Sequence, residues 1–396
     1  MATPVVVISP RRARPFFARH PWVFAGSVAR VEGKPTVGDE VRVISAEGKF
    51  IARGLINPGM NLLVRLYRWT DEPLDRPFWE STVESALALR RILPSISLEN
   101  SALRLVSSEA DGISGLTVDR YGDWLVASFT SHALWCNRKP LLDLLMEKVP
   151  CQGILVRFDG SQAAREGIEK PAEEQCGSTP AGPIEILENG LRFEVDLQAG
   201  QKTGFFLDQR NNRLAAASFA AHRNALDLCC YTGGFALNLA SHGQAAHVLG
   251  IDSSTPAIQR AMRNALLNNL ANVEFQAGDV FRTLDSLRSS GRRFGIIVCD
   301  PPKFASRQKD LDSALNGYLK LNRAAVDLLE PGGILVTCSC SGSVDRASFQ
   351  AVLGEVAALA ERPIRILQSL GHPPDHPVSV SCPESEYLKC LIARVD

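Results

Sequence analysis

Two short segments combine residue types that can do chemistry. The letters DPPK run from Asp300 to Lys303 after an apolar strand-like stretch, and TCSCSG places Cys338 and Cys340 at the end of another. Two prolines cannot extend a strand, so they would hold Asp300 and Lys303 at a strand's carboxyl end. A thiol at a neighbouring strand end is a candidate nucleophile. The alternative, a cysteine simply buried in an apolar strand, suits Cys299 better than Cys340, which a strand-ending Ser-Gly follows.

Acidic residues and glycines follow three further strand-like stretches. The letters DLCCYTGGF (227–235) precede a helix, and their glycines let the backbone approach a ligand. They do not match the dinucleotide pattern GxGxxG. Asp252 closes the next stretch, where a carboxylate suits a ribose diol. Asp279 ends the stretch after it, where a loop could meet an adenine. Each aspartate can instead cap the following helix. Three acids at consecutive strand ends favour a nucleoside ligand.

Alternating strands and helices must position these residues. From about residue 224 the chain predicts helices at 256–269 and about 312–330, and strands at 225–230, 247–252, 273–278, 295–300, 333–340 and 387–395. Apolar strands that alternate with helices predict a parallel sheet covered on both faces. We therefore expect an α/β fold in which the strand-end residues meet at one edge.

The preceding chain predicts two smaller domains. Residues 1–72 contain short alternating strands and form a β-rich domain, whereas residues 73–184 alternate helices and strands as a small α+β domain. Within the latter, residues 169–182 have the composition of an exposed loop. The third domain, 185–396, opens with a β-hairpin around Asn189-Gly190.

Composition sets the broad class of protein. The 396 residues suggest two or three domains, and 45% apolar with 22% charged residues argues against an intrinsically disordered chain. Lys plus Arg and Asp plus Glu both number 43, so a nucleic-acid partner must be argued from a local patch. Residues 1–30 supply one, because they hold five arginines, four interleaved aromatics and no acid. The alternative is a solvated face over core aromatics.

Three features suggest a cytoplasmic protein. No apolar run is long enough to span a membrane, and the apolar stretch near the N-terminus precedes the arginines, the reverse of a signal peptide. The ten cysteines contain no CxxC pair, which indicates reduced thiols. No metal is expected, since neither HxH nor HExxH occurs.

The motifs together resemble a known family. The set YTGGF, DPPKF and SCSG, preceded by QKTGFFLDQR (201–210), is similar to the S-adenosylmethionine-dependent methyltransferases that make 5-methylcytosine in 23S ribosomal RNA, the large-subunit methyltransferase I type. The resemblance covers most of the chain, including RHPWVFAGSVARVEGKPTVGD, which looks like that family's PUA domain, and YLK near the C-terminus. It implies a Rossmann-like, seven-stranded methyltransferase sheet with a reversed last strand.

The resemblance also implies a site. Cys340 would be the nucleophile, with Cys338 as the alternative, because both lie on one strand face. Asp300 would bind the cytosine edge, and Lys303 would either lower the pKa of the cysteine or bind a phosphate. S-adenosylmethionine would contact Asp208, Arg210, Asp227, Tyr231, Thr232, Gly233, Gly234, Asp252, Ser253, Asp279, Val280 and Asp300.

The implied partner is 23S ribosomal RNA or a large-subunit assembly intermediate, and a homodimer is compatible with the sequence but not required by it. RNA contacts are expected at Arg11, Arg12, Arg14, Arg19, His20 and Trp22. Two other functions remain open. A methyltransferase acting on a purine nitrogen needs no thiol, because nitrogen is already nucleophilic. A non-catalytic RNA-binding protein would use the sheet only as a scaffold.

Overall fold

The computed structural model of the chain describes residues 3–93, 101–168, 174–198, 204–304 and 310–396. These residues fall into two compact units. The first unit comprises Met1–Ile186, Val195–Leu207 and Pro374–Ser385, and the second comprises Leu187–Glu194, Asp208–Pro373 and Glu386–Asp396. Each unit is described by itself below.

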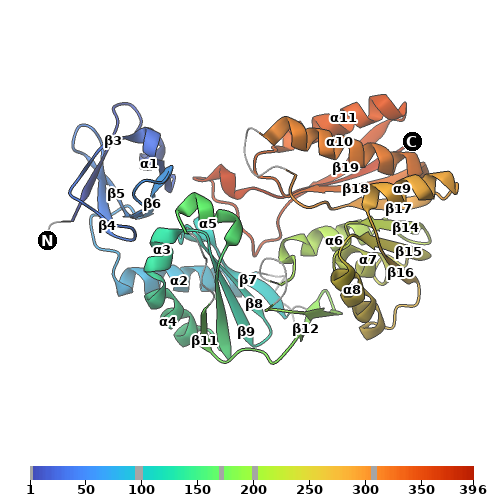
Figure 1. Cartoon of the computed structure of the whole chain (residues 1–396), viewed down its shortest axis with the longest axis horizontal. Coiled ribbons are helices and arrows are strands. Elements are labelled where there is room, and N and C mark those ends of the chain that lie inside the picture. Colours follow the sequence, from blue (N-terminus) through green and yellow to red (C-terminus); the bar gives the residue numbers. More distant parts are fainter. Residues whose placement is uncertain (1–2, 94–100, 169–173, 199–203, 305–309) are drawn as a thin grey trace. The chain divides into compact units, whose positions relative to one another are not determined.

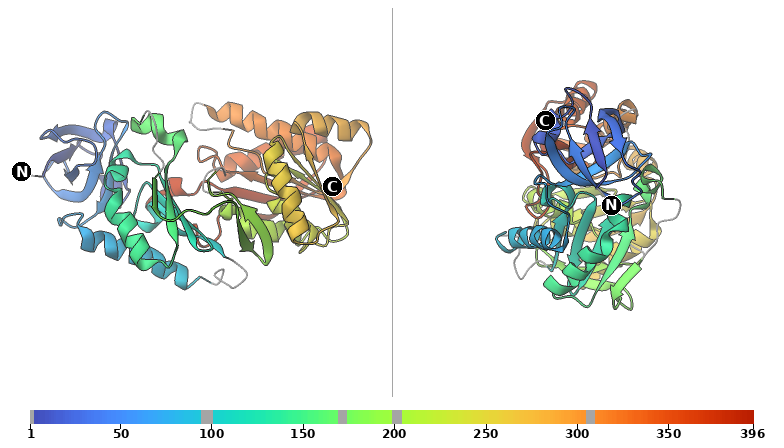
Figure 2. Two further views of the ribbon diagram at one scale, coloured as in Figure 1. Left: turned by 60° about the horizontal axis from the view of Figure 1, so that its bottom comes forward. Right: turned by 90° about the vertical axis from the view of Figure 1, so that its left-hand side faces the viewer.

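The first unit begins with a six-stranded sheet, blue in Figure 1 and Figure 2. Its strand order is β2-β6-β5-β4-β1-β3, and only β1 and β4 run parallel. Alternating residues of the sheet and Phe16 of the short helix α1 make one apolar core. The elements are β1 (Val5–Ile8), α1 (Arg14–Phe17), β2 (Trp22–Phe24), β3 (Val28–Glu32), β4 (Glu40–Ile44), β5 (Phe50–Ile56) and β6 (Leu62–Arg68).

A second, five-stranded sheet completes the first unit. Its order is β11-β10-β9-β8-β7, and β9 and β10 run parallel. Helix α2 starts where the Asp75 carboxylate accepts a hydrogen bond from Phe78 N at 3.1 Å. The elements are α2 (Arg76–Arg91), β7 (Ala102–Ser107), β8 (Leu116–Tyr121), β9 (Trp124–Phe129), α3 (His132–Cys136), α4 (Arg138–Lys148), β10 (Gly153–Phe158), α5 (Gly160–Glu166) and β11 (Glu174–Gly177).

Buried charges join the two sheets of the first unit. The Arg65 guanidinium of β6 donates to the Glu166 carboxylate at 3.0 Å and lies 3.4 Å from the Glu109 carboxylate. Asn57 donates to the same Glu166 at 3.0 Å. Removing one member of such a cluster would leave an unpaired buried charge. The six-stranded sheet is therefore held to the five-stranded sheet by specific partners as well as by apolar contact.

The second unit is built on a seven-stranded sheet in the order β16-β15-β14-β17-β18-β20-β19. The first five strands in that order are parallel, and β20 is antiparallel to both β18 and β19. This confirms the α/β fold with a seven-stranded sheet and a reversed last strand. The strands are β14 (Asn224–Leu228), β15 (His247–Asp252), β16 (Val273–Ala277), β17 (Phe294–Cys299), β18 (Leu329–Ser339), β19 (Ile364–Leu370) and β20 (Lys389–Val395).

Helices cover both faces of this sheet, as an all-parallel core requires. Helix α10 packs against α9 and α11, and α7 packs against α6 and α8 on the other side (Figure 1). Three of these helices begin with a side-chain cap, supplied by Ser254, Asp279 and Asp345. The helices are α6 (Arg210–Ala217), α7 (Gly234–Ala240), α8 (Thr255–Leu267), α9 (Val280–Ser289), α10 (Leu311–Leu328) and α11 (Arg346–Ala360).

The expected hairpin is formed by β12 (Ile184–Glu188) and β13 (Leu191–Val195). Its two turn residues, Asn189 and Gly190, have φ values of 52° and 76°. Positive φ at both central residues is what a two-residue type I′ turn needs, and Asn-Gly adopts it at low cost.

Three local expectations differ from the structure. Strand β19 was not predicted, because an edge strand with both faces partly exposed lacks clean alternation. Within the expected loop at 169–182, Glu174–Gly177 forms the edge strand β11, whose polar composition resembles that of a loop; residues 169–173 lie outside the described chain. Cys229, expected in an apolar strand, lies beyond β14 with φ of 61°.

Among the residues that the structure describes, no helix has both the length and the apolar character needed to cross a bilayer.

Two glycine substitutions test how backbone conformation contributes to stability. A Cβ added at Gly190 or at Gly354, in the middle of α11, meets no atom within 4 Å, and only Gly190 has a positive φ. We expect Gly190→Ala to lower the free energy of unfolding by about 1 kcal/mol. Gly354→Ala should raise it by about 0.5–1 kcal/mol, since alanine favours a helix. Chemical denaturation of both variants measures this, and equal effects would contradict the argument.

Candidate active site

The parallel strands bring the sequence-predicted residues to one edge of the seven-stranded sheet. Leu228 pairs with Ile251 of β15 on one side and with Cys299 of β17 on the other, and Cys299 pairs with Thr337 of β18. The strands therefore end at nearly the same level. The residues that follow them, from Cys229, Asp252, Asp300 and Cys340 onward, share the carboxyl edge where ligands of such sheets bind.

The loop after β14 has an unusual backbone. Cys229, Tyr231 and Gly233 all have positive φ, at 61°, 49° and 87°. A Cβ on Gly233 would lie 2.6 Å from Cδ1 of Leu237 and 2.9 Å from Cζ of Phe275, so only glycine fits. Non-glycine residues with positive φ cost of order 1 kcal/mol each and persist where the surroundings hold them. Such a tight loop allows the backbone to approach a ligand closely.

Two aspartates shape this loop. Asp227 is fully buried, and its Oδ2 accepts a hydrogen bond from Ala236 N at 2.9 Å, whereas Oδ1 has no partner among the described residues. Burial raises the pKa of Asp227 well above its usual range. Asp252 is half-buried, and its oxygens accept from Tyr231 N and Ser254 N, both at 2.9 Å. Each oxygen has a second lone pair that a hydroxyl could use.

The other expected cofactor contacts differ in exposure. Asp279 is exposed and accepts from Arg282 N at 2.9 Å, so it caps α9 as the alternative reading required. Val280 is half-buried and Ser253 is exposed. Thr232 and Gly234 are buried within the loop.

The segment before α6 supplies side chains to the same edge. The Gln209 amide donates to Asp300 Oδ1 at 3.0 Å and accepts from Asn212 at 2.6 Å, and both amide residues are buried. Asp208 accepts a hydrogen bond from the Tyr387 hydroxyl at 2.8 Å. A chain of hydrogen bonds thus orients the Asp300 carboxylate. Residues 201–203 of the QKTGFFLDQR motif lie outside the described chain.

Arg210 does not project into solvent but belongs to a buried charge cluster. It is 1% exposed, and its Nε lies 4.0 Å from the Glu188 carboxylate of the hairpin. Arg213 forms an ion pair with the same Glu188. The Arg213 guanidinium also fills the space where a Cβ on Gly234 would be, with Nε only 2.6 Å away. Glycine at this position is therefore required by the arginine packed beneath the loop.

The two candidate thiols have different surroundings. Cys340 follows the last residue of β18 and is half-buried. Cys338 lies within β18 opposite Cys390 of β20 and is fully buried. Burial raises the pKa of the Cys338 thiol, and also that of Cys299, well above the usual range. A thiolate, the reactive form, is thus disfavoured at Cys338.

Lys389, expected from the sequence only as part of the YLK motif, pairs with Ser339 at the same edge of the sheet. It is 2% exposed, and its Nζ donates to Ser341 O at 2.7 Å and Tyr387 O at 2.8 Å. Nearby, the buried Tyr318 hydroxyl lies 3.2 Å from Ser341 Oγ. The available signal was a lysine at the start of the apolar stretch KCLIARV, because lysine is rarely buried without partners. Lys303, by contrast, is exposed.

The expected RNA-contacting residues divide into two groups. Arg11, Arg12, Arg14 and Arg19 are exposed, and none forms an ion pair with a described residue. Phe17 and Phe24 beside them are 41% and 38% exposed. His20 and Trp22 instead have partners within the unit: the Trp22 indole donates to Glu109 at 3.0 Å, and His20 contacts Glu384.

His20, Cys382 and Glu384 place one ligand-type atom each within 4.8 Å of one another. The backbone N–H of Trp22 donates to His20 Nδ1 at 3.2 Å, so the proton of the neutral ring belongs on Nε2. Nε2 lies 3.3 Å from the Glu384 carboxylate, and the Cys382 thiol lies 3.5 Å from it. The three side chains therefore satisfy one another by hydrogen bonding, which accounts for their proximity.

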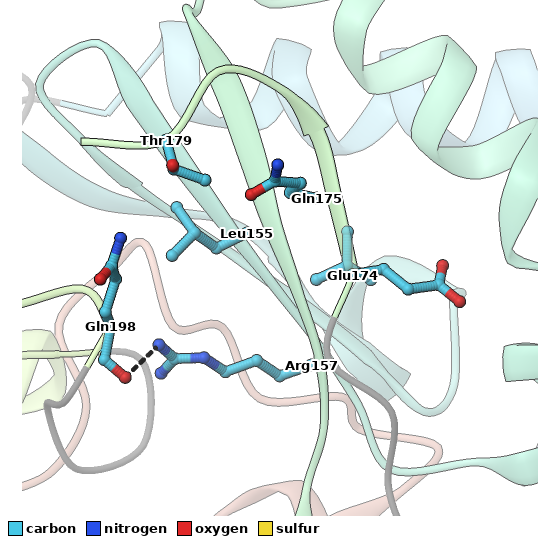
Figure 3. Close-up of a pocket in the computed structure, with 7 residues that line it drawn as sticks. Leu155, Arg157, Glu174, Gln175, Thr179 and Gln198 are labelled. Atoms are coloured by element: carbon cyan, nitrogen blue, oxygen red, sulfur yellow. Dashed lines mark hydrogen bonds between the residues drawn. The ribbon is translucent and has the colours of Figure 1, made fainter. Parts of the chain in front are cut away.

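A cavity of about 270 Å³ lies elsewhere in the first unit, beside β10 and β11 (Figure 3). Arg157 lines it and donates to Gln198 O at 3.1 Å. None of the sequence-predicted site residues lines it. Its lining residues are Leu155, Val156, Arg157, Glu174, Gln175, Thr179 and Gln198.

Comparison with known families gives two matches. Residues 168–394 match the S-adenosylmethionine-dependent methyltransferase family, and residues 6–69 match the PUA-like domain family. The first match covers the whole seven-stranded sheet, and the second covers the six-stranded sheet.

Individual proteins are also similar over the full length. The chain is 37% identical to the ribosomal RNA large subunit methyltransferase I of Tolumonas auensis, covering 98% of each chain. It is 38% identical to the protein of the same name from Shewanella frigidimarina, covering 98% of this chain and 99% of the relative. A solved structure of a protein assigned as a methyltransferase, in complex with SAH, has a TM-score of 0.86 at 22% identity and shares the fold over both whole chains.

Proposed function

Because the chain belongs to the S-adenosylmethionine-dependent methyltransferases of the ribosomal RNA large subunit methyltransferase I family, we propose that it methylates carbon 5 of a cytosine in 23S ribosomal RNA. The large-subunit RNA substrate is inferred from the names of the similar proteins. The choice of cytosine rests on one observation, the half-buried Cys340 that follows β18 at the same sheet edge as Asp300.

Carbon-5 chemistry needs a nucleophilic side chain. Cytosine C5 is a poor nucleophile until a thiolate adds to C6. In the proposed reaction the Cys340 sulfur forms a bond to C6, and the electrons of the C5=C6 double bond make C5 nucleophilic. When bound, S-adenosylmethionine supplies the electrophilic methyl group. A base then removes the C5 proton, the double bond re-forms, and the Cys340 thiolate leaves.

The surroundings of the two thiols support Cys340 over Cys338 as this nucleophile. Cys338 is fully buried in the sheet, and burial raises the pKa of its thiol. A cytosine that enters a pocket at the sheet edge can reach Cys340, which follows the strand, more easily than Cys338, which lies within the strand. We further propose that Asp300, oriented by Gln209, hydrogen-bonds the N3/N4 edge of the cytosine.

The residues at the strand ends fit the cofactor. We propose that Asp252 binds the ribose hydroxyls and that the loop from Tyr231 to Gly234 lies against the cofactor, which the required glycine at position 233 supports. Asp208 would orient the neighbouring segment through Tyr387. Asp279 and Val280 would lie near the adenine. The buried Arg210, Arg213 and Glu188 hold the loop from below rather than contact the cofactor.

We propose three domains: a PUA-like RNA-binding domain at 1–72, a central α+β domain at 73–184, and a methyltransferase domain at 185–396. The family matches at 6–69 and 168–394 support the first and the last. The target base must leave any stack to reach a pocket, so the substrate is a single-stranded or splayed nucleotide. The four exposed arginines would bind phosphates of the same RNA.

The decisive test is methyl transfer from labelled S-adenosylmethionine to unmodified 23S RNA, followed by digestion to nucleosides. We expect the label in 5-methylcytidine, and we expect Cys340→Ala to abolish it because no thiolate can add to C6. Cys338→Ala is the matched control and should retain turnover. Label in a methylated purine, or full turnover by Cys340→Ala, would exclude the carbon-5 proposal.

Cofactor binding tests Asp252 separately. Asp252→Asn removes the charge that would accept the ribose hydroxyls, and hydrogen bonds to charged groups contribute about 1.5–3 kcal/mol. Calorimetric titration with S-adenosylmethionine should therefore show an affinity at least about tenfold weaker. Asp285→Asn, at an exposed acid of α9 paired with Arg288, is the control and should bind normally. Equal affinities for the two variants would argue against Asp252 as the ribose ligand.

The arginine patch is tested by the salt dependence of RNA binding. Replacing Arg11, Arg12, Arg14 and Arg19 together by glutamine should reduce the slope of log K against log salt by about 3, since each phosphate contact contributes about 0.7–0.9. Arg30→Gln is the matched control, because Arg30 is exposed but paired with Glu32. An unchanged slope in the fourfold variant would assign these arginines to a solvated face.

A further inference from the structure

Lys389 is a buried lysine beside the proposed nucleophile. It is the first residue of β20 and pairs with Ser339, the last residue of β18 and the neighbour of Cys340. Its side chain is 2% exposed, and Nζ donates to the carbonyl oxygens of Ser341 and Tyr387. The ammonium group is therefore tied to the turn that carries Cys340.

The carbonyl oxygens bind the ammonium group but do not neutralise it. Carbonyls carry no net charge, so the cation needs an anionic partner nearby. Four charged or titratable groups lie around it: Cys340 from the end of β18, Asp345 and Arg346 at the start of α11, and Glu386 before β20. Two of these are already engaged, since Arg346 pairs with Glu386 at 2.9 Å.

The remaining acid has a separate partner. Asp345 caps α11 by accepting from Ser348 N at 2.7 Å, and its side chain is exposed to solvent.

Burial lowers the pKa of Lys389 to about 8, and among its charged neighbours Cys340 opposes that shift most. Neutral pH lies below this pKa, so the amine is protonated.

We propose that Lys389 is the cation that holds Cys340 in its thiolate form, a positioning and electrostatic role that the family match and the relatives' names do not assign. The inference rests on the proposed role of Cys340. The Cys340 thiol gives its proton to solvent, and Lys389 keeps all three of its own, two of them on Ser341 O and Tyr387 O. The resulting pair of opposite charges lies in a partly desolvated place, where attraction is stronger than in water.

The same cation acts at both ends of the reaction. Addition to C6 converts the thiolate into a neutral thioether, and elimination makes the thiolate again as leaving group. Lys389 stabilises that anion in both states, so it favours release of the product as well as attack. Lys303, for which either this role or phosphate binding was expected, is exposed and better suited to a phosphate.

The test measures the rate at which iodoacetamide alkylates Cys340, resolved from the other cysteines by peptide mass spectrometry, as a function of pH and without RNA or cofactor. Lys389→Gln keeps hydrogen-bond donors but removes the charge, whereas Lys389→Arg keeps the charge. We expect the pH midpoint of alkylation to rise by about one unit or more in Lys389→Gln and to be restored towards wild type in Lys389→Arg.

Two control variants sharpen the result. Lys320→Met, at an exposed lysine of α10, should leave the midpoint unchanged. Lys303→Met addresses the rival cation and should also leave it unchanged. A raised alkylation midpoint in Lys303→Met, together with an unchanged midpoint in Lys389→Gln, would overturn the proposal. Equal midpoints in wild type and in a folded Lys389→Gln would also overturn it.

A measurement on wild type keeps the proposal testable if the lysine variants do not fold. The difference in thiolate absorbance near 240 nm between wild type and Cys340→Ser, followed with pH, reports the ionisation of Cys340 alone. A midpoint near that of a free thiol, about 8.5, would overturn the proposal. This readout is independent of methyl transfer. If Cys340→Ala kept full turnover, the proposed function would fail while the alkylation midpoints would still report the pairing.

Discussion

The site depends on the pairing register of four parallel strands, which makes them end at nearly the same level of the sheet. Pairing of β14 with β15 and β17, and of β17 with β18, ends the strands at one edge and brings together the residues that follow them. The loop after β14 can turn tightly there only because glycine occupies position 233. A one-residue slip in any of these pairs would move every side chain of that strand to the other face.

The antiparallel strand β20 adds the second half of the site. It inserts between β18 and β19, so a segment at the C-terminal end of the chain lies beside the strand that contains Cys338 and ends just before Cys340. This insertion buries Cys338 against Cys390 and places Lys389 next to Ser339. One pairing thus buries one thiol and places a lysine near the other, so two cysteines only two residues apart have different surroundings.

Buried charges recur wherever segments distant in sequence meet. Glu188 of the hairpin pairs with Arg213 beneath the glycine loop, and Arg65 joins the two sheets of the first unit through Glu166. Each cluster carries a desolvation cost, and loss of one member would leave an unpaired buried charge. The exposed arginines near α1 are the opposite case, because solvent satisfies them and leaves them available to an anionic partner.

The amino-acid sequence by itself determined the strands of the second unit other than β19, the Asn-Gly hairpin and the motifs at the strand ends. These depend on local patterns: apolar stretches, turn residues and prolines that end a strand. The two cysteines of TCSCSG could not be separated in this way, because alternation places both on one face. Likewise, Asp279 as ligand or cap, and His20 and Trp22 as RNA contacts or packed side chains, had equal local support.

Tertiary structure distinguishes the two cysteines by burial and supplies partners for His20 and Trp22. Whether Cys338 is accessible depends on β20, about fifty residues further along the chain, and whether His20 is engaged depends on Glu384. The role of Lys389 depends on the same pairing, since this lysine lies beside Ser339 and reaches Ser341 O only when β20 pairs with β18. Burial and charge partners are properties of contacts between distant segments, and no local pattern encodes them.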